Sequence, residues 1–448
     1  MKTLNINFKV ILLISIFLIS SKNIYSQWTI AGNLAGVDGR PTVSVVDQNT
    51  AFVTGGSGGP EINATYKTTN GGLNWIQLNT GTSRPFLCIW AKDANTVFAG
   101  EGVVYKTTNG GTNWTLIDSI FGTAFSIKGI QFSNSIPSFG IVLEQESSGS
   151  YTYKTRDGGN TWNRTPVSVG EVLAINGLNV VDSLFYAFGA AFISPSIIIT
   201  TDGGVTWNLR DLNLPFSEFT NGVAFKDDKQ TGIAGASLPI IARTTNGGLN
   251  WVNIDVGNNV TGTVCRMRWI QGTNTCYVSA SDPTNGGILK STNGGLNWTQ
   301  MTTSGLGIYN FDTKRIGSNV YGYAISSLSG LVGGNQVLKV TDVITGINQI
   351  SELVPEGYSL SQNYPNPFNP VTKIKFDITR DARRETQDVG LVIYNLLGKE
   401  VTTLVNENLQ MGSYEVDFDG NNFSTGIYFY KLVVDGNIID TKRMMLLK

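Results

Sequence analysis

The sequence contains no histidine, so any catalysis would depend on carboxylate, lysine or tyrosine side chains. Ser-His-Asp and Cys-His mechanisms are excluded, as is every zinc site that needs a histidine ligand. Glu144 and Glu146 are two residues apart, which would place them on one face of a strand. Asp227 and Asp228 lie in a polar turn, and Glu101 follows a strand that ends in small residues. Two carboxyl groups at a suitable separation can hydrolyse a glycoside, but solvated surface charge explains each of these residues more simply. We expect no catalytic, cofactor-binding or metal-binding residues.

Two tryptophans and two arginines are further candidates for a binding site. Trp90 and Trp269 each align with a phenylalanine in other copies of a repeat described below, which favours a position in the core. The alternative is that one of them stacks on a glycan or peptide at an exposed face. Arg266 and Arg268 would lie on the opposite face of the Trp269 strand, where they could line a cleft.

Composition argues against several classes of protein. The net charge is −1, and no run of lysine or arginine is present. Such a chain is atypical of nucleic-acid-binding proteins and offers no basic patch to a membrane. The three cysteines, Cys88, Cys265 and Cys276, do not form a disulfide framework. A hairpin turn at 271–274 would place Cys276 opposite Trp269, so we expect free, buried thiols.

The N-terminus has the pattern of an export signal. Lys2 and Lys9 precede an apolar run, 10–19, and a polar segment follows that ends at Ser26. The run is too short to span a bilayer and is typical of a signal peptide. Residues 1–26 are therefore predicted to direct export. No later run of about 18 apolar residues suggests a transmembrane segment.

One ten-residue phrase, "YKTTNGGLNW" at 66–75, occurs in six variants along the chain. Asn-Gly and Asp-Gly are strong hairpin signals because a type I′ turn needs positive φ at both central residues, and we expect the second glycine to relieve the strain. The turn residue is Asn in four copies and Asp in two, an exchange that a turn tolerates and a metal or acid–base site does not. We assign the phrase a structural role, carried by Asn70, Gly72, Trp75, Asn109, Gly111, Trp114, Asp157, Gly159, Trp162, Asp202, Gly204, Trp207, Asn246, Gly248, Trp251, Asn293, Gly295 and Trp298.

The phrase recurs with the spacing of β-propeller blades. Each unit also contains apolar runs separated by polar turns, so about four short strands are expected per unit. A seventh unit ends in "LKVTD" (338–342) without the Gly-Gly and the tryptophan, while Trp28 stands alone before the first unit. We infer a seven-bladed propeller over residues 27–345, in which the Trp28 strand completes the last blade and closes the ring.

The phrase resembles the Asp-box (BNR) hairpin of sialidases, xyloglucanases, sortilin-type receptors and propellers similar to the photosystem II assembly and stability factor. The whole-unit pattern resembles the last group most closely. This resemblance implies a fold and says little about activity, because these families share the hairpin and differ in chemistry. The F/Y-R-I-P motif of sialidases is absent.

The last hundred residues read as a second domain. We expect a linker over 346–360 and a small Ig-like antiparallel sandwich over 361–448, with about seven short strands separated by glycine turns. The segments "YPNPFNP", "IYNLLGKEV", "GSYEVDFDG", "STGIYFYKL" and "TKRMMLLK" resemble the C-terminal (type A) sorting domain of type IX secretion. The resemblance implies an address read by the secretion machinery, with Gly412, Tyr414, Gly426, Tyr428 and Lys442 as signal residues.

Together the two ends predict a protein that crosses the periplasm and reaches the medium or the outer cell surface. The favoured function is a non-enzymatic module that binds an extracellular protein or glycan. The alternatives are a carboxylate-dependent glycoside hydrolase or lyase acting on extracellular polysaccharide, and an assembly factor retained at a membrane. We expect no cofactor.

Overall fold

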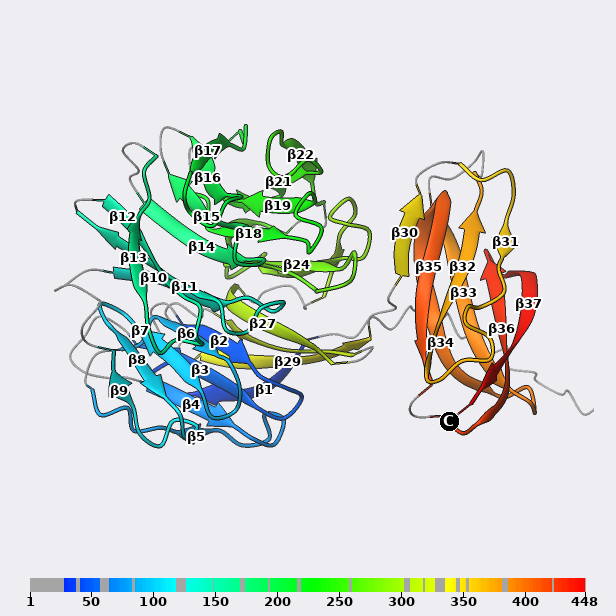
Figure 1. Cartoon of the computed structure of the whole chain (residues 1–448), viewed down its shortest axis with the longest axis horizontal. Coiled ribbons are helices and arrows are strands. Elements are labelled where there is room, and N and C mark those ends of the chain that lie inside the picture. Colours follow the sequence, from blue (N-terminus) through cyan, green and yellow to red (C-terminus); the bar gives the residue numbers. More distant parts are fainter. Residues whose placement is uncertain are drawn as a thin grey trace, which may run out of the picture.

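A computed structural model of the chain describes residues 28–447, apart from 38–40, 57–63, 83–84, 118–125, 148, 170–173, 192–193, 216–218, 258–259, 302–306, 317–318, 327–334, 344–346, 352–353, 381–385 and 421–422. The expected export signal lies outside the described residues. All the regular elements in these residues are β-strands, so the all-β prediction is confirmed. In Figure 1 the strands form a large body of radiating sheets and a smaller body of two sheets.

Seven sheets make up the larger body among the described residues. The strands of each sheet are given from the innermost outwards. The first two sheets contain β2 (Thr42–Val45), β3 (Ala51–Gly55), β4 (Ala64–Thr68) and β5 (Ile76–Gln77), and β6 (Cys88–Ala91), β7 (Val97–Gly100), β8 (Val104–Thr107) and β9 (Thr115–Leu116). The next two sheets contain β10 (Ser126–Phe132), β11 (Gly140–Glu146), β12 (Gly149–Thr155) and β13 (Asn163–Pro166), and β14 (Ala174–Val180), β15 (Tyr186–Ala191), β16 (Pro195–Thr200) and β17 (Asn208–Asp211). The other three are β18 (Gly222–Phe225), β19 (Gly232–Gly235), β21 (Ile240–Thr244) and β22 (Val252–Asp255); β23 (Gly262–Trp269), β24 (Cys276–Ala280), β25 (Gly287–Ser291) and β26 (Thr299–Gln300), with β20 (Ser237–Leu238) added beside β23; and β27 (Ile308–Ile316), β28 (Asn319–Ser326), β29 (Asn335–Val343) and β1 (Thr29–Leu34).

The innermost strands contact one another in a closed ring, from β2 through β6, β10, β14, β18 and β23 to β27, which returns to β2. The ring is completed by the N-terminal strand, as the sequence predicted. β1 pairs antiparallel with β29, with Thr29 opposite Lys339. Trp28 is buried and packs edge-on against Phe311, and its backbone N–H bonds to the carbonyl of Met301 at 3.2 Å. Both ends of the propeller therefore belong to one sheet.

The repeated phrase forms a tight turn whose geometry differs from the type I′ prediction. The two glycines, rather than Asn-Gly, have positive φ, at 70° for Gly71 and 81° for Gly72. Asn70 instead acts through its side chain, because its Oδ1 accepts from the backbone N–H of Asn74 at 3.0 Å. The Thr68 hydroxyl oxygen accepts from the N–H of Gly72 at 2.9 Å. The turn thus needs two adjacent glycines because both positions lie in the left-handed region.

Basic side chains of the phrase also join most blades to the next one. Lys67 Nζ donates to the Gly110 carbonyl in the following phrase at 3.3 Å. The same contact links Lys154 to Gly203, Arg243 to Gly294 and, across the closure of the ring, Lys339 to Gly71. Lys106 instead donates to the second glycine of the next phrase, Gly159.

The last blade lacks the Gly-Gly phrase, so it offers Lys290 of the preceding blade no equivalent glycine carbonyl. Lys290 Nζ forms a buried ion pair at 2.8 Å with Asp342, the residue that replaces Asn70 in the "LKVTD" variant. The repetition of the phrase is therefore explained by contacts within and between blades.

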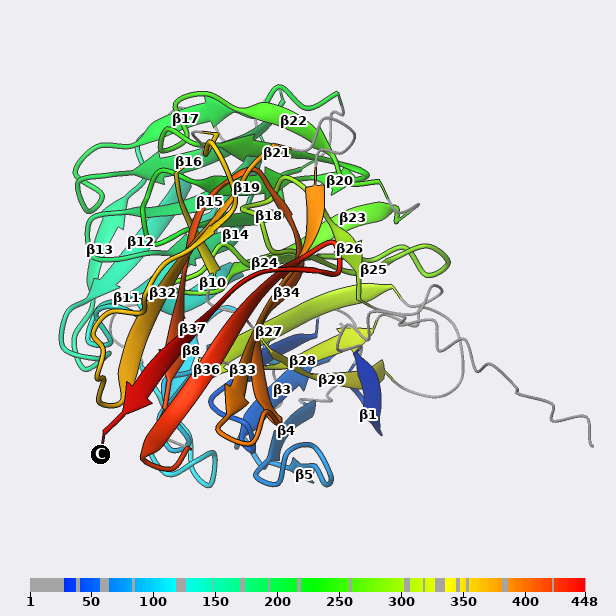
Figure 2. The same cartoon turned by 90° about the vertical axis from the view of Figure 1, so that its right-hand side faces the viewer.

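The smaller body is an antiparallel sandwich of two four-stranded sheets. One contains β30 (Ile347–Ser351), β35 (Gly412–Asp419), β32 (Val371–Ile378) and β31 (Ser359–Leu360), and the other contains β34 (Glu400–Gln410), β33 (Thr386–Asn395), β36 (Gly426–Val434) and β37 (Asn437–Leu446). In Figure 2 the long strands β36 and β37 run side by side. The alternating burial of β32 and β35 sends Phe376 and Tyr414 into the core, where their rings stack.

The expected linker over 346–360 is corrected by the structure. β30 and β31 both lie in this range, and each pairs with a strand of the sandwich, β30 with β35 and β31 with β32. Both strands are short, and β31 has only two residues, too few for a measurable alternation. Residues 347–360 therefore contribute strands to the small domain.

Candidate ligand-binding channel

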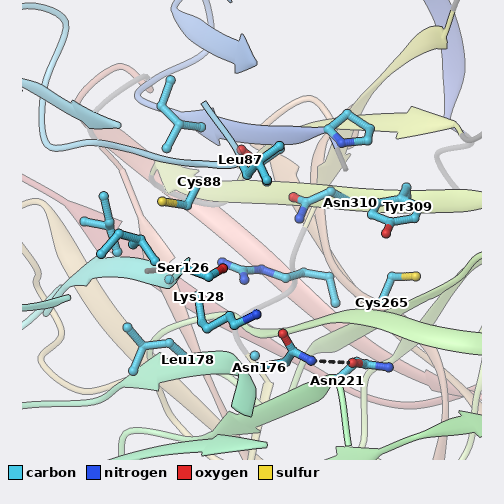
Figure 3. A pocket seen from close by; sticks show the side chains of 18 of the residues that line it. Leu87, Cys88, Ser126, Lys128, Asn176, Leu178, Asn221, Cys265, Tyr309 and Asn310 are labelled. Atoms are coloured by element: carbon cyan, nitrogen blue, oxygen red, sulfur yellow. Dashed lines mark hydrogen bonds between the residues drawn. The ribbon is translucent and has the colours of Figure 1, made fainter. Parts of the chain in front are cut away.

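A cavity with a ligand-like volume lies on the axis of the propeller, between the innermost strands. It measures about 500 Å³ and is lined by residues in or beside the innermost strand of every blade. Such a volume is typical of small-molecule sites. Figure 3 shows the labelled side chains of Ser126, Lys128, Asn176, Tyr309 and Asn310 around it. The closed ring of blades thus builds a site to which every repeat contributes.

The charges along this channel are positive. Lys128 and Arg266 are the charged residues in its described lining, and no carboxylate belongs to that lining. The Nε of Arg266 is buried without a hydrogen-bond partner in the described part of the chain. Burial, the largest cause, and the nearby charge of Arg268 lower the pKa of Arg266 to about 9, against the opposing effect of Asp312. The guanidinium is therefore charged at neutral pH and poorly compensated.

The opposite mouth of the channel combines tryptophans with cations. A cavity of about 190 Å³ is lined there by Trp90, Trp269 and several charged residues, namely Lys92, Asp227, Arg268, Asp312, Lys314 and Arg315. Both tryptophans are half-buried, so each packs against a blade core and also presents part of its ring to the cavity. The sequence offered a core position and an exposed face as alternatives for these tryptophans, and each tryptophan has both.

The alignment of the two tryptophans needs a correction. Trp269 pairs with Cys276 at the end of its hairpin, as Phe132 pairs with Gly140, so this alignment was right. In the hairpin of Trp90 the terminal pair is Ala91 with Val97, which places Trp90 one residue earlier, level with Arg268. The sequence hid this shift because both neighbours, Ile89 and Ala91, are also apolar.

One level of the innermost strands carries polar side chains that bond to the next blade. Ser44, Asn179 and Asp312 each accept a backbone N–H of the following blade at 2.9 Å. Asp312 also pairs with Arg268, with Oδ1 3.0 Å from Nε, and Arg268 lies 5.8 Å from the Trp90 ring. Both oxygens of Asp312 are thus occupied, and its charge is balanced within this layer.

Replacing Asp312 by Asn should destabilise the propeller by about 1–3 kcal/mol. The amide can keep the bond to the Val45 N–H, but Arg268 would lose its ion-pair partner in a buried position. Equilibrium urea unfolding would measure the change. Asp255→Asn, at an exposed carboxylate of β22, is the matched control and should leave the unfolding free energy nearly unchanged; equal effects of the two variants would contradict this role of Asp312.

The carboxylates singled out in the sequence have structural partners. Glu144 and Glu146 share one strand face, as expected, and Arg164 bridges them at 3.3 and 2.5 Å. The Tyr153 hydroxyl also donates to Glu144 at 3.0 Å. Burial, the largest cause, raises the pKa of Glu144. Neither glutamate lines the two cavities described above.

The remaining acidic candidates stabilise turns. Asp227 Oδ2 accepts the N–H of Gly272 at 2.6 Å, and Asp228 accepts that of Thr231 at 2.8 Å. The backbone carbonyl of Glu101 accepts the N–H of Ile127. Asp227 lines the smaller cavity, whereas the other two residues lie outside both cavities.

Two of the thiols, Cys88 and Cys276, are buried as predicted, whereas Cys265 is only half-buried. Cys88, Cys265 and Cys276 are free, and the pairing of Trp269 with Cys276 has the register that the sequence predicted. Burial raises the pKa of Cys88 to about 12 and that of Cys265 to about 11. Both line the larger cavity as neutral thiols.

The acidic copies of the repeated phrase are held as anions by their own turns. Hydrogen bonds from Thr206 are the largest cause lowering the pKa of Asp202 to about 2, and Thr161 likewise lowers the pKa of Asp157. No group of three or more Cys, Asp or Glu side chains suited to a metal ion occurs in the described ranges.

The residues assigned to the sorting signal lie in the sandwich. Tyr414 and Tyr428 are buried, and each hydroxyl bonds to a backbone carbonyl four residues earlier, at Gln410 and Ser424. Gly412 and Gly426 begin β35 and β36. Lys442 on β37 pairs with Asp440 at 3.0 Å and is partly exposed. The tyrosines thus stabilise the fold, and Lys442 lies at its surface.

Two family models match separate parts of the chain. Residues 362–446 match the secretion system C-terminal sorting domain, and residues 186–331 match the photosynthesis system II assembly factor YCF48. No curated protein matches the sequence significantly. No described helix is long and apolar enough to span a membrane.

Solved structures resemble the propeller at low identity. A structure of YCF48 bound to D1 peptide is 17% identical, with a TM-score of 0.52 and coverage of 71% of this chain and 98% of that chain. YCF48 from Cyanidioschyzon merolae is 14% identical, with a TM-score of 0.47 and coverage of 70% and 98%. The WD40 repeats of RRP9 are 9% identical, with a TM-score of 0.54 and coverage of 71% and 98%.

These similarities at low identity concern the fold alone. The sorting domain directs export by type IX secretion to the cell surface or extracellular space. The chain is thus a BNR-type β-propeller similar to YCF48 that carries a C-terminal type IX sorting domain.

Proposed function

We propose that the exported propeller is a non-enzymatic module that binds an extracellular protein or glycan along its central axis. The observation that carries this proposal is the positively charged axial cavity of about 500 Å³, whose described lining contains no carboxylate. Such a site can hold a ligand by charge and hydrogen bonds, but it lacks the pair of carboxyl groups that glycoside hydrolysis requires.

The opposite mouth supports the same function. Trp90 and Trp269 offer flat apolar surface beside cations, a combination that suits sugar rings or peptide side chains. The two carboxylates there, Asp227 and Asp312, already accept hydrogen bonds from the protein. The structural relative solved with a bound peptide adds a precedent for ligand binding by this fold.

Replacing Trp90 or Trp269 by Ala should weaken binding of the ligand about tenfold, as is usual for aromatic anchors. The full exported protein would be screened against arrays of glycans and bacterial surface proteins, and the affinity for each positive ligand measured by calorimetry. Trp207→Ala removes a half-buried phrase tryptophan away from both cavities and should leave affinity unchanged. Robust turnover of a polysaccharide by the wild-type protein would contradict the proposal.

A further inference from the structure

The uncompensated cation in the axial channel indicates which ligands the proposed module would bind. Arg266 is half-buried, and its Nε is buried without a hydrogen-bond partner in the described part of the chain. A buried guanidinium nitrogen without a partner is costly, so its presence suggests a ligand that supplies the missing negative charge.

The carboxylate that acts electrostatically on Arg266, that of Asp312, does not meet this need. Asp312 interacts with Arg266 over a distance but is bound directly to Arg268 and to the N–H of Val45. Lys128 adds a second positive charge to the same cavity. An anionic group entering the channel would therefore meet two cations and no carboxylate of the described lining.

The rest of the lining is suited to a ligand rich in hydroxyl groups. Asn176, Asn221, Asn310, Ser126 and Ser281 all border the cavity. The Asn176 amide donates to Asn221 Oδ1 at 3.1 Å (Figure 3). That bond leaves the carbonyl oxygen of Asn176 and the amide nitrogen of Asn221 as one acceptor and one donor. Side chains that both donate and accept are those that recognise sugar hydroxyls.

From this arrangement we propose that the axial channel binds a carboxylated sugar, with Arg266 and Lys128 holding the carboxylate and the asparagines holding the ring hydroxyls. The inference rests on the proposed binding function and narrows it to one chemical class. A uronic acid combines these groups within the size of the cavity. It could enter as a free monosaccharide or as the end of an acidic glycan.

Titration of the full exported protein with glucuronate, with a digalacturonate and with glucose tests this assignment. We expect both acids to bind and glucose to bind at least about tenfold more weakly, since it lacks the charge-assisted contacts. Binding of both acids would indicate a site for the free sugar, whereas binding of the digalacturonate alone would indicate the end of a glycan.

Arg266→Met should reduce the affinity for the acidic sugar by at least about tenfold while raising the melting temperature, because the buried charge is removed. A loss of affinity together with a higher melting temperature would distinguish a binding role of Arg266 from a structural one. Arg210→Met makes the same change on the outer strand β17 and should alter neither quantity. Arg266→Lys, which keeps the charge, should retain part of the affinity.

Three results would overturn the assignment: no binding of either acid, equal binding of glucose, or binding of an acidic peptide without binding of either sugar acid. The binding function itself would survive these results if a neutral glycan or a protein still bound through Trp90 and Trp269. Failure of the narrower inference is therefore distinguishable from failure of the proposed function.

Discussion

Deletion of residues 347–448 is expected to leave the propeller in the periplasm and to abolish its delivery to the cell surface and medium. The segment matched by the sorting-domain model, 362–446, lies within this deletion. The cut is placed before β30 because this strand pairs with β35 of the sandwich. A cut further along the chain would leave β30 as an unpaired edge, which invites aggregation. Fractionation followed by immunoblotting of the medium, surface and periplasm measures the effect.

A matched control for this deletion is a variant that keeps the sandwich and weakens the propeller. Asp312→Asn meets this need because the buried ion pair lies far along the chain from the sorting domain. It should still be exported if it folds. Continued surface delivery of the truncated protein would contradict the sorting role of the C-terminal domain.

Trp28→Ala should lower the unfolding free energy of the propeller by about 3–5 kcal/mol, the usual cost of truncating a buried tryptophan. Trp28 packs against Phe311, and the strand that follows it completes the last blade. Losing this anchor would free the N-terminal strand and expose the edge of β29. Equilibrium urea unfolding of the purified protein, followed by tryptophan fluorescence and by circular dichroism, provides the measurement.

Thr29→Ala is the control for ring closure, because Thr29 is exposed and adjacent in the same strand. It should change the unfolding free energy by less than about 0.5 kcal/mol. If Trp28→Ala were as mild as this control, the N-terminal strand would not be what holds the ring closed.

The sequence predicted most of the fold because the repeat is local and regular. The phrase at 66–75 marked one strand pair per unit, and its loss at "LKVTD" revealed that Trp28 had to complete the last blade. The structural role of Asn70 in this turn was also anticipated. The backbone angles were not, because a Gly-Gly pair can shift the positive φ values by one residue without any change in composition.

The contacts between blades were missed because they join residues far apart in the chain. Lys67 is part of a conspicuous phrase, yet nothing local shows that it bonds to Gly110 in the next copy. The sequence raised a cleft lined by Arg266 and Arg268 only as an alternative, and Arg266 does line the channel and Arg268 the smaller cavity. Lys128 and Asn176 were not singled out. Aligning the first strand of each unit and asking which side chains are polar could have found them.

The central claim, that this exported propeller binds a ligand without transforming it, is tested most directly by one incubation of the full exported protein with digalacturonate. Calorimetry would record binding, and chromatography of the same sample after prolonged incubation would show whether the sugar is intact. We expect saturable binding that is lost in Arg266→Met, with all of the digalacturonate recovered unchanged. Cleavage of the sugar by the wild-type protein would contradict this account, whereas the absence of any binding would overturn the assignment of a carboxylated sugar to the channel.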